Sequence, residues 1–293
     1  MHVKFRISLL AAATAAVAGL AAIPASAVAS QTTSHAATPP HGVIVHGLRY
    51  ASTVHLPRTH LPHFLLKKTV LSGNWAGYAA VADTGDQIAF AGANFNIPSV
   101  NCANSPRGSS GYAFASHWIG LDGYSSTTVE QTGIDAYCHT GSTPTYYAWY
   151  EMYPLNPVAF TGVNPGDAIA ATVTFNSTNN TYHLRLNDLT NGGFVSATQS
   201  CPAGSTCANS SAEVITEDPG GAVPAGVNLA DFGMSNFTAT RITSLSGLSG
   251  SLNPSAQWTS SQIQMVDPAN AAMATPSGLY GGRSFNIAWN SAS

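Results

Sequence analysis

The stretch TVEQTGIDAYC, residues 128–138, decides the fold of this 293-residue chain. Threonine, valine, isoleucine and tyrosine recur in it at short spacing, which is typical of a β-strand. Because successive side chains of a strand point to opposite faces, Val129, Gln131, Gly133 and Asp135 should share one face. The predicted strand therefore presents an uncharged glutamine and a carboxylate on the same side.

Strands of the same character recur along the chain after residue 69. They are QIAFAGANFNI (87–97), YAFASHWIGL (112–121), YYAWYEMY (146–153), AIAATVTF (168–175), YHLRLNDL (182–189), SAEVITE (211–217) and RSFNIAW (283–289). Turn residues separate them, and Asn179-Asn180 predicts a hairpin because asparagine tolerates positive φ. Helical patterns with caps are nearly missing. We therefore expect an all-β fold, an antiparallel, lectin-like β-sandwich of two packed, curved sheets.

The first 27 residues have the pattern of an export signal. Lys4 and Arg6 precede the apolar run SLLAAATAAVAGLAAI (8–23), and PASA (24–27) has the small residues of a signal-peptidase site. No later segment has 18 uninterrupted apolar residues, so we expect no membrane partner after export. These features predict a secreted, extracellular protein.

Charge divides the rest of the chain into two parts. Residues 28–69 carry four lysines and arginines, six histidines and no carboxylate, whereas residues 70–293 carry thirteen carboxylates, four arginines and no lysine. The basic part lacks a periodic apolar pattern, and we interpret it as a pro-segment that inhibits the acidic body by charge complementarity. Acid would change its histidines near pH ~6.5 and the body carboxylates near ~4, which predicts that the contact between the two parts depends on pH. A solvated linker is the alternative.

The body, residues 70–293, is expected to form one β-sandwich domain. We expect it to be a monomer that binds no nucleic acid. Its four cysteines favour two disulfides in an exported protein: CPAGSTC closes a short loop between Cys201 and Cys207, and Cys102 then pairs with Cys138 by elimination. Spacings typical of a zinc site are absent, so no metal or other cofactor is expected.

Familiar catalytic motifs are either absent from the chain or lack the sequence context that they need. The triplet Asp83-Thr84-Gly85 is found in pepsin-like peptidases, but these need a second aspartate triplet, and VADTGDQ reads instead as a hairpin turn. The chain has no G-x-S-x-G and no H-E-x-x-H motif, and its three body histidines, His117, His139 and His183, each stand alone.

Four segments of the body, in order and spacing, carry a resemblance to a known family. They are SGNWAGY (72–78), HWIGLDG (117–123), VEQTGIDAY with YAWYEMYP (129–154), and SAEVITED with ADFG (211–233). The body resembles the glutamic peptidases (eqolisins), acid proteases with a β-sandwich fold and a catalytic dyad of glutamine and glutamate. The family commonly has tryptophan directly after that glutamate, where this chain has Val214.

The resemblance implies which residues form the site. Gln131 takes the place of the dyad glutamine and Glu213 that of the dyad glutamate, although Glu217 shares a strand face with Glu213 and only the alignment favours Glu213. The supporting and substrate-binding groups fall on Trp118, Asp122, Asp135, Trp149, Glu151 and Tyr153.

The predicted function is acid hydrolysis of polypeptide substrates, with release of the pro-segment in acid by self-cleavage near the region from Lys67 to Ser72. The glutamate would take a proton from water, and the glutamine amide would stabilise the oxyanion without adding a second negative charge. Two alternatives remain: a non-catalytic carbohydrate-binding sandwich, and a glycoside hydrolase that uses Glu151 and Glu213.

Overall fold

The computed structural model describes residues 43–45, 48–50, 55–59, 69–220 and 226–293. The predicted export signal lies outside the described residues, and the predicted pro-segment is described in part. Residues 38–293 form one compact unit. Within the described residues, no helix is long and apolar enough to cross a membrane.

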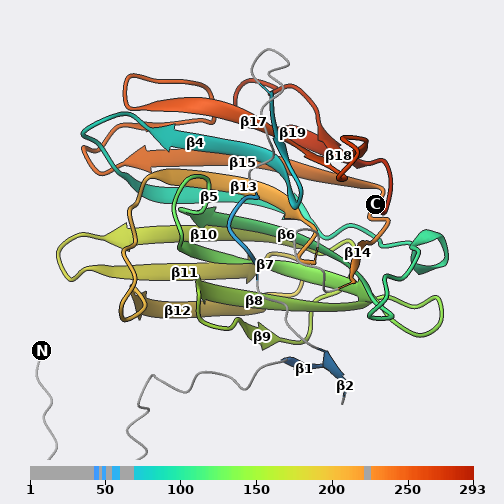
Figure 1. Cartoon of the computed structure of the whole chain (residues 1–293). Coiled ribbons are helices and arrows are strands. Elements are labelled where there is room, and N and C mark those ends of the chain that lie inside the picture. The colour runs from blue at the N-terminus through green and yellow to red at the C-terminus, as the bar shows by residue number, and fades with distance from the viewer. Residues whose placement is uncertain (1–42, 46–47, 51–54, 60–68, 221–225) are drawn as a thin grey trace, which may run out of the picture. The chain divides into compact units, whose positions relative to one another are not determined.

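The body folds into two layers of β-strands that run in roughly the same direction across the molecule (Figure 1). The first layer contains β3 (Thr69–Ser72), β17 (Trp258–Val266), β4 (Trp75–Ala82), β13 (Ser211–Glu217), β6 (Ala113–Leu121), β7 (Val129–Cys138), β8 (Thr145–Tyr153) and β9 (Val158–Phe160), in that spatial order, with β14 (Asn228–Leu229) beside β6. The second layer contains β12 (Phe194–Ser200), β11 (Thr181–Asp188), β10 (Ala168–Asn176), β5 (Ile88–Asn96), β15 (Met234–Ser244), β19 (Phe285–Trp289) and β18 (Ala272–Pro276), with β16 (Ser249–Gly250) beside β15.

Hydrogen bonds between β17 and β18 join the two layers at one edge. The strands of both layers therefore form one continuous hydrogen-bonded sheet that folds into two layers. The pairings within it are antiparallel except β3 with β17 and β14 with β6. Two further strands, β1 (Val43–Val45) and β2 (Leu48–Tyr50), pair with each other, and a 3₁₀ turn, η1, covers Cys102–Asn104. The predicted all-β sandwich is confirmed.

Alternating side chains from both layers form the core between them. Ile119 and Val214 face it from the first layer, and Ile169, Leu184 and Phe237 face it from the second. Val214 is fully buried there. The residue that replaces the family's tryptophan therefore packs in the core, on the strand face opposite that of its neighbour Glu213.

Two turns test the local predictions. Asn180 has a φ of 53° in the turn between β10 and β11, as the predicted hairpin requires. Asp83-Thr84-Gly85 also forms a turn, but the prediction of a hairpin there is wrong. It joins β4 to β5, which lie in different layers and do not pair with each other.

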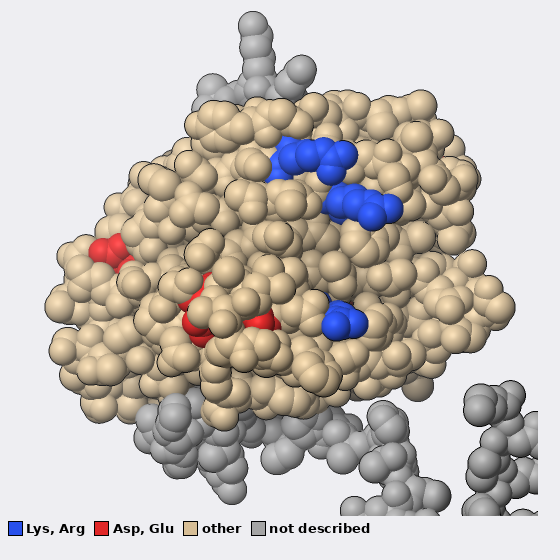
Figure 2. All heavy atoms as spheres, turned by 180° about the vertical axis from the view of Figure 1, so that it is seen from behind, with Lys and Arg blue, Asp and Glu red and all other residues tan. Residues whose placement is uncertain are grey.

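Most carboxylates of the body are buried. Of the thirteen in the chain, ten are buried: Asp122, Glu130, Asp135, Glu151, Asp167, Asp188, Glu213, Glu217, Asp218 and Asp231. The other three are partly buried. The face shown in Figure 2 accordingly carries only scattered acidic and basic groups. Acid will therefore remove few surface charge pairs from this protein.

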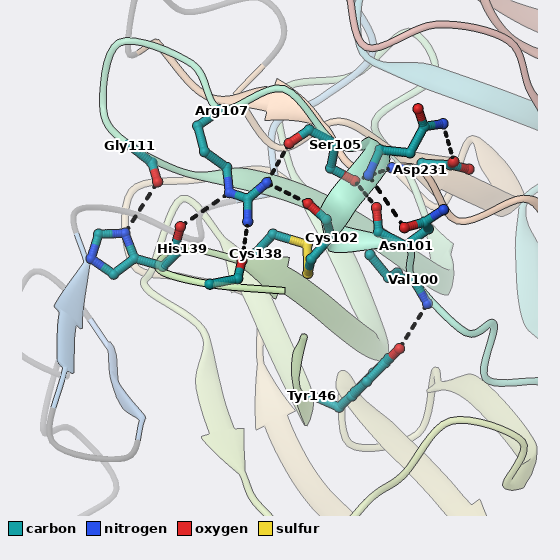
Figure 3. Close-up of a disulfide and its surroundings, with 12 residues drawn as sticks. Val100, Asn101, Cys102, Ser105, Arg107, Gly111, Cys138, His139, Tyr146 and Asp231 are labelled. Atoms are coloured by element: carbon teal, nitrogen blue, oxygen red, sulfur yellow. Dashed lines mark hydrogen bonds between the residues drawn. A yellow bond between two sulfur atoms is a disulfide. The ribbon is translucent and has the colours of Figure 1, made fainter. Parts of the chain in front are cut away.

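Both predicted disulfides are present, Cys102–Cys138 and Cys201–Cys207. Beside the first, the Arg107 guanidinium donates to the backbone carbonyls of Cys102 and Gly141 at 2.7 Å each and of His139 at 3.1 Å (Figure 3). One buried bridge and one cation thus fasten the loop after β7 to the segment before β6.

Candidate active site

The candidate site lies on the face of the first layer that is turned away from the core. Along β13, Val214 belongs to the core, whereas Ile215 belongs to a second buried cluster that contains Trp75, Trp118 and Trp149. Trp75 and Trp118 meet edge to face, with 4.9 Å between ring centroids. This aromatic floor is rigid and holds the polar groups between its rings.

The imidazole of His55, from the segment before the body, fills a pocket in this site. Its Nε2 lies 3.0 Å from Asp135 Oδ1 and 3.1 Å from Ser116 Oγ, and its Nδ1 lies 3.2 Å from Glu151 Oε2. The ring stacks on Trp149 with 3.7 Å between centroids and an 8° interplanar angle. No part of His55 is exposed. A protonated imidazole has a donor on each nitrogen and so matches two carboxylates at once.

Asp135 is the centre of this pocket. Its carboxyl group accepts hydrogen bonds from the Tyr147 hydroxyl at 2.7 Å, from Trp149 Nε1 at 2.8 Å and from the Ser116 hydroxyl, besides the contact to His55. The β6–β7–β8 register sets this arrangement, because it places Ser116 and Tyr147 directly opposite Asp135. With its acceptor positions taken, Asp135 binds and orients groups and is poorly placed to activate water.

Gln131 contacts the main chain of the same segment. Its Nε2 donates to the His55 carbonyl oxygen at 3.1 Å and to Glu151 Oε2 at 2.8 Å. Glu151 thereby fixes which end of the amide faces the peptide. Gln131 Oε1 has no hydrogen-bond partner among the described residues. The amide can thus polarise a carbonyl with one end and accept a hydrogen bond with the other.

Glu217 contacts the other side of the same peptide bond. The Leu56 amide donates to Glu217 Oε1 at 3.1 Å, and Trp118 Nε1 donates to Glu217 Oε2 at 2.8 Å. Asn74 Nδ2 lies 3.4 Å from Glu217 Oε1. Gln131 and Glu217 therefore flank the peptide bond between His55 and Leu56, the first at its oxygen and the second at its nitrogen.

The residues after Leu56 are also held. The Arg58 amide donates to the Gly123 carbonyl oxygen at 3.1 Å, and its guanidinium lies 4.5 Å from the centre of the Tyr124 ring. The Thr59 amide and hydroxyl both donate to Asn74 Oδ1, at 2.9 and 2.8 Å. Residues 55–59 thus lie along the site as an extended peptide would.

Glu213 shares the strand face of Glu217 but not its contacts. The register places Gly120 between Glu213 and Gln131, and neither carboxyl oxygen of Glu213 has a hydrogen-bond partner among the described residues. Burial raises the pKa of Glu213 well above its ordinary value, an effect that the nearby Ser211 hydroxyl opposes and the Asp122 charge increases. The structure therefore brings Glu217, and not the sequence-predicted Glu213, against the bound peptide segment.

Two other predicted site residues also lie outside these contacts. Asp122, in the left-handed region with a φ of 67°, accepts from the amides of Asn209 at 2.7 Å and Ser210 at 2.8 Å, so it anchors a loop. Tyr153, at the end of β8 opposite Val129, is partly buried and packs against the aromatic cluster. The predicted Trp118, Asp135, Trp149 and Glu151 all contact Gln131, Glu217 or the segment.

The charges in the site depend on one another. Burial alone would lower the pKa of His55, but Asp135 and Glu151 outweigh it and raise that pKa to about 10. Burial raises the pKa of Glu217 to about 8, against the effect of the His55 charge and with that of Glu151. The pKa of Glu151 is likewise raised by burial, against the effect of His55. His55 is thus the cation of a site with three buried carboxyl groups.

Comparisons with known proteins agree on one family. The model of the Peptidase A4 family matches residues 73–289. Aspergillopepsin-2 from Aspergillus niger is 31% identical over 221 residues, which are 68% of this chain and 75% of that protein. Scytalidopepsin B from Scytalidium lignicola is 32% identical over 155 residues, 52% of this chain and 54% of that protein.

Solved structures show the same similarity. A crystal structure of scytalido-glutamic peptidase with a transition state analog inhibitor superposes with a TM-score of 0.60 and 27% identity, covering 74% of this chain and 98% of that one. A structure of SCP-B, described as a member of the eqolisin family in a complex with the tripeptide Ala-Ile-His, gives 0.56 and 26%, with the same coverage. These similarities do not favour the carbohydrate-binding alternative.

Proposed function

The chain belongs to the Peptidase A4 family of glutamic peptidases and is a hydrolase, and from this premise we propose that it is a secreted acid endopeptidase with Gln131 and Glu217 as its catalytic dyad. The observation that carries the assignment is the position of the two side chains on one peptide bond, at 3.1 Å from its carbonyl oxygen and 3.1 Å from its nitrogen. The peptide ligands named for the related structures are consistent with polypeptide substrates.

Gln131 supplies the electrophilic half of the mechanism. Its amide donates to the carbonyl oxygen, where negative charge develops when water attacks the carbon. Glu151 holds the amide in that orientation at 2.8 Å. A neutral donor fits this place, because a second negative charge would further destabilise an ionised glutamate nearby.

Glu217 supplies the proton transfers. As a carboxylate it takes a proton from the attacking water, and from its place beside the amide nitrogen it returns that proton to the leaving amine. Trp118 Nε1 stabilises the ionised form, since its hydrogen bond lowers the pKa of Glu217. Burial opposes this, so the base is ionised to a smaller extent when a peptide covers it.

Residues 55–59 serve as the inhibitory part of the pro-segment. They cover Gln131 and Glu217, and His55 places its positive charge among the site carboxyl groups. An added substrate cannot reach the dyad until this segment leaves or is cut. Secretion through the N-terminal signal, and release of the pro-segment in acid, belong to the same proposal.

A pair of variants tests the dyad. Glu217→Gln should lower the digestion of a denatured protein substrate at pH 3–5 by at least about a thousandfold, because it removes the base. The matched control, Glu213→Gln, should retain activity within about threefold. Circular dichroism and Tm show whether each variant is folded. Activity that survives Glu217→Gln and is lost in Glu213→Gln would return the base to Glu213, the residue that the sequence predicted.

A further inference from the structure

The His55–Leu56 peptide bond lies on the dyad in the orientation of a substrate. Gln131 Nε2 donates to the oxygen of this bond, and the amide on its nitrogen side donates to Glu217 Oε1. An inhibitory segment could equally cross a site in the reverse direction or with no bond at the reacting position. Here the oxygen meets the electrophile and the nitrogen meets the proton donor.

Contacts on both sides hold that bond in register. Before it, the His55 amide donates to Glu151 Oε2 at 3.2 Å. After it, Trp75 Nε1 donates to the Leu56 carbonyl oxygen at 3.0 Å, and Asn74 Nδ2 lies 3.3 Å from the Pro57 carbonyl oxygen. These groups belong to the body and contact main-chain atoms, so they would hold any extended peptide in the same way.

The side chain before the bond is recognised individually. The His55 pocket has a flat aromatic wall, Trp149, and an acceptor for each ring nitrogen, on Asp135 and Glu151. An apolar ring would stack but leave both buried carboxyl groups without a partner from the side chain before the bond. A protonated imidazole stacks on Trp149 and donates to both carboxyl groups. The pocket therefore selects the side chain that precedes the bond.

We propose that the His55–Leu56 bond is the first self-cleavage site of this chain, and that the His55 pocket is the subsite that selects the residue before the scissile bond, with preference for a protonated histidine. The inference rests on the proposed function. Water adds to the His55 carbonyl carbon while Glu217 takes its proton, the carbon–nitrogen bond breaks, and the proton passes to the Leu56 nitrogen. The products are a carboxyl group on His55 and a free amine on Leu56.

This position differs from the predicted cleavage between Lys67 and Ser72. Residues Thr69–Ser72 form β3, which is hydrogen-bonded along β17, and Ser72 is buried. A peptide bond within this paired strand does not lie between Gln131 and Glu217. The segment is also a slow substrate, because Glu217 under the docked peptide is largely protonated in acid.

The test acidifies the purified full chain and follows new amino termini by mass spectrometry over time. We expect Leu56 to appear first, at a rate independent of protein concentration, and no processing in Glu217→Gln. His55→Ala should slow this step at least about tenfold, roughly the loss of one hydrogen bond to a charged group. A first terminus between Lys67 and Ser72 would overturn the proposal. So would one at Leu61, whose preceding His60 belongs to a second His-Leu-Pro sequence.

A second measurement examines the pocket without the pro-segment. Peptides that differ only before a Leu-Pro pair, with His, Phe or Ala there, are cleaved by the acid-processed enzyme. We expect kcat/KM for His to exceed that for Phe by about tenfold or more, and Asp135→Asn to reduce this ratio within the same variant. Equal rates for His and Ala would overturn the proposed selectivity. Digestion of a denatured protein in parallel shows whether the peptidase itself is active, so the two proposals can fail separately.

Discussion

The charge of His55 predicts that raising the pH, and not lowering it, loosens the segment 55–59. The pKa of His55 is raised from 6.5 to about 10 in the docked segment. A group whose pKa is raised stabilises the docked state fully below its free value, near pH 6.5, and loses this effect as the pH rises through about 10. The groups facing the ring are Asp135, Glu151 and, at longer range, Glu217. Protonation of the histidine therefore cannot release the segment in acid.

The magnitude follows from that shift. That change in pKa corresponds to about 5 kcal/mol, or about three and a half orders of magnitude in the docking equilibrium. Solvent does not screen this interaction, because the His55 side chain is fully buried. Protonation of His55 in acid therefore strengthens the docking of the segment and does not weaken it. Release in acid must come from cleavage or from protonation of the carboxyl groups.

Trypsin can measure this docking equilibrium. Its target is the Arg58–Thr59 bond, since Arg58 is only 6% exposed in the docked segment. In a Glu217→Gln background, which prevents self-cleavage, the protection of this bond should fall by about a thousandfold between pH 6.5 and 10. An unstructured peptide of the same sequence corrects for the pH dependence of trypsin, and His55→Gln should show weak protection throughout. Protection that stays constant or rises with pH would refute the reasoning, as would an NMR titration that places the His55 pKa at or below 6.5.

Three further changes probe the site and its support. Trp118→Phe removes the donor that lowers the pKa of Glu217, so kcat should fall about tenfold to a hundredfold and the acidic limb of the pH–rate profile should move upward. Gly133→Ala would place a Cβ 2.5 Å from that of Trp118; we expect a loss of roughly 2 kcal/mol or more in urea unfolding, with lower activity. Replacing both Cys102 and Cys138 by serine opens a bridge with a sequence separation of 36, which should cost about 3–4 kcal/mol by chain entropy and lower Tm.

The fold could be predicted because it depends on local alternation. The strand predicted at 128–137 appears as β7 at Val129–Cys138, and its two faces are the ones that alternation assigns. β4, β15 and β17 were not predicted, because their small and polar residues give a weak pattern even though their neighbours bury them. Their strand structure depends on long-range pairing, which local propensity does not contain.

The choice between Glu213 and Glu217 shows where prediction from the sequence stops. The two residues lie on one strand face, so alternation cannot separate them. What separates them is the β13–β6 register, which places Glu217 opposite Ser116, at the Asp135 end of the site. The role of His55 was harder still to predict, because nothing in the sequence of the basic pro-segment indicates that one of its histidines is buried. Its only sequence signal is the His-Leu-Pro triplet that recurs at residues 60–62.

Without the pro-segment, the described residues of the body place carboxyl groups and no cation at the dyad, which predicts that the body is an acid-stable protein that the pro-segment protects at neutral pH. Burial raises the pKa of Glu151, the docked His55 opposes this, and the Asp135 charge adds to it. Burial also raises the pKa of Asp218, to about 7. Raised carboxyl pKa values give stability that is present below about pH 4 and lost as the pH rises through the folded values. The Tm of the processed body should therefore fall between pH 4 and 8, while the Tm of the Glu217→Gln precursor falls less. Equal pH dependence of the two would show that His55 does not neutralise the site.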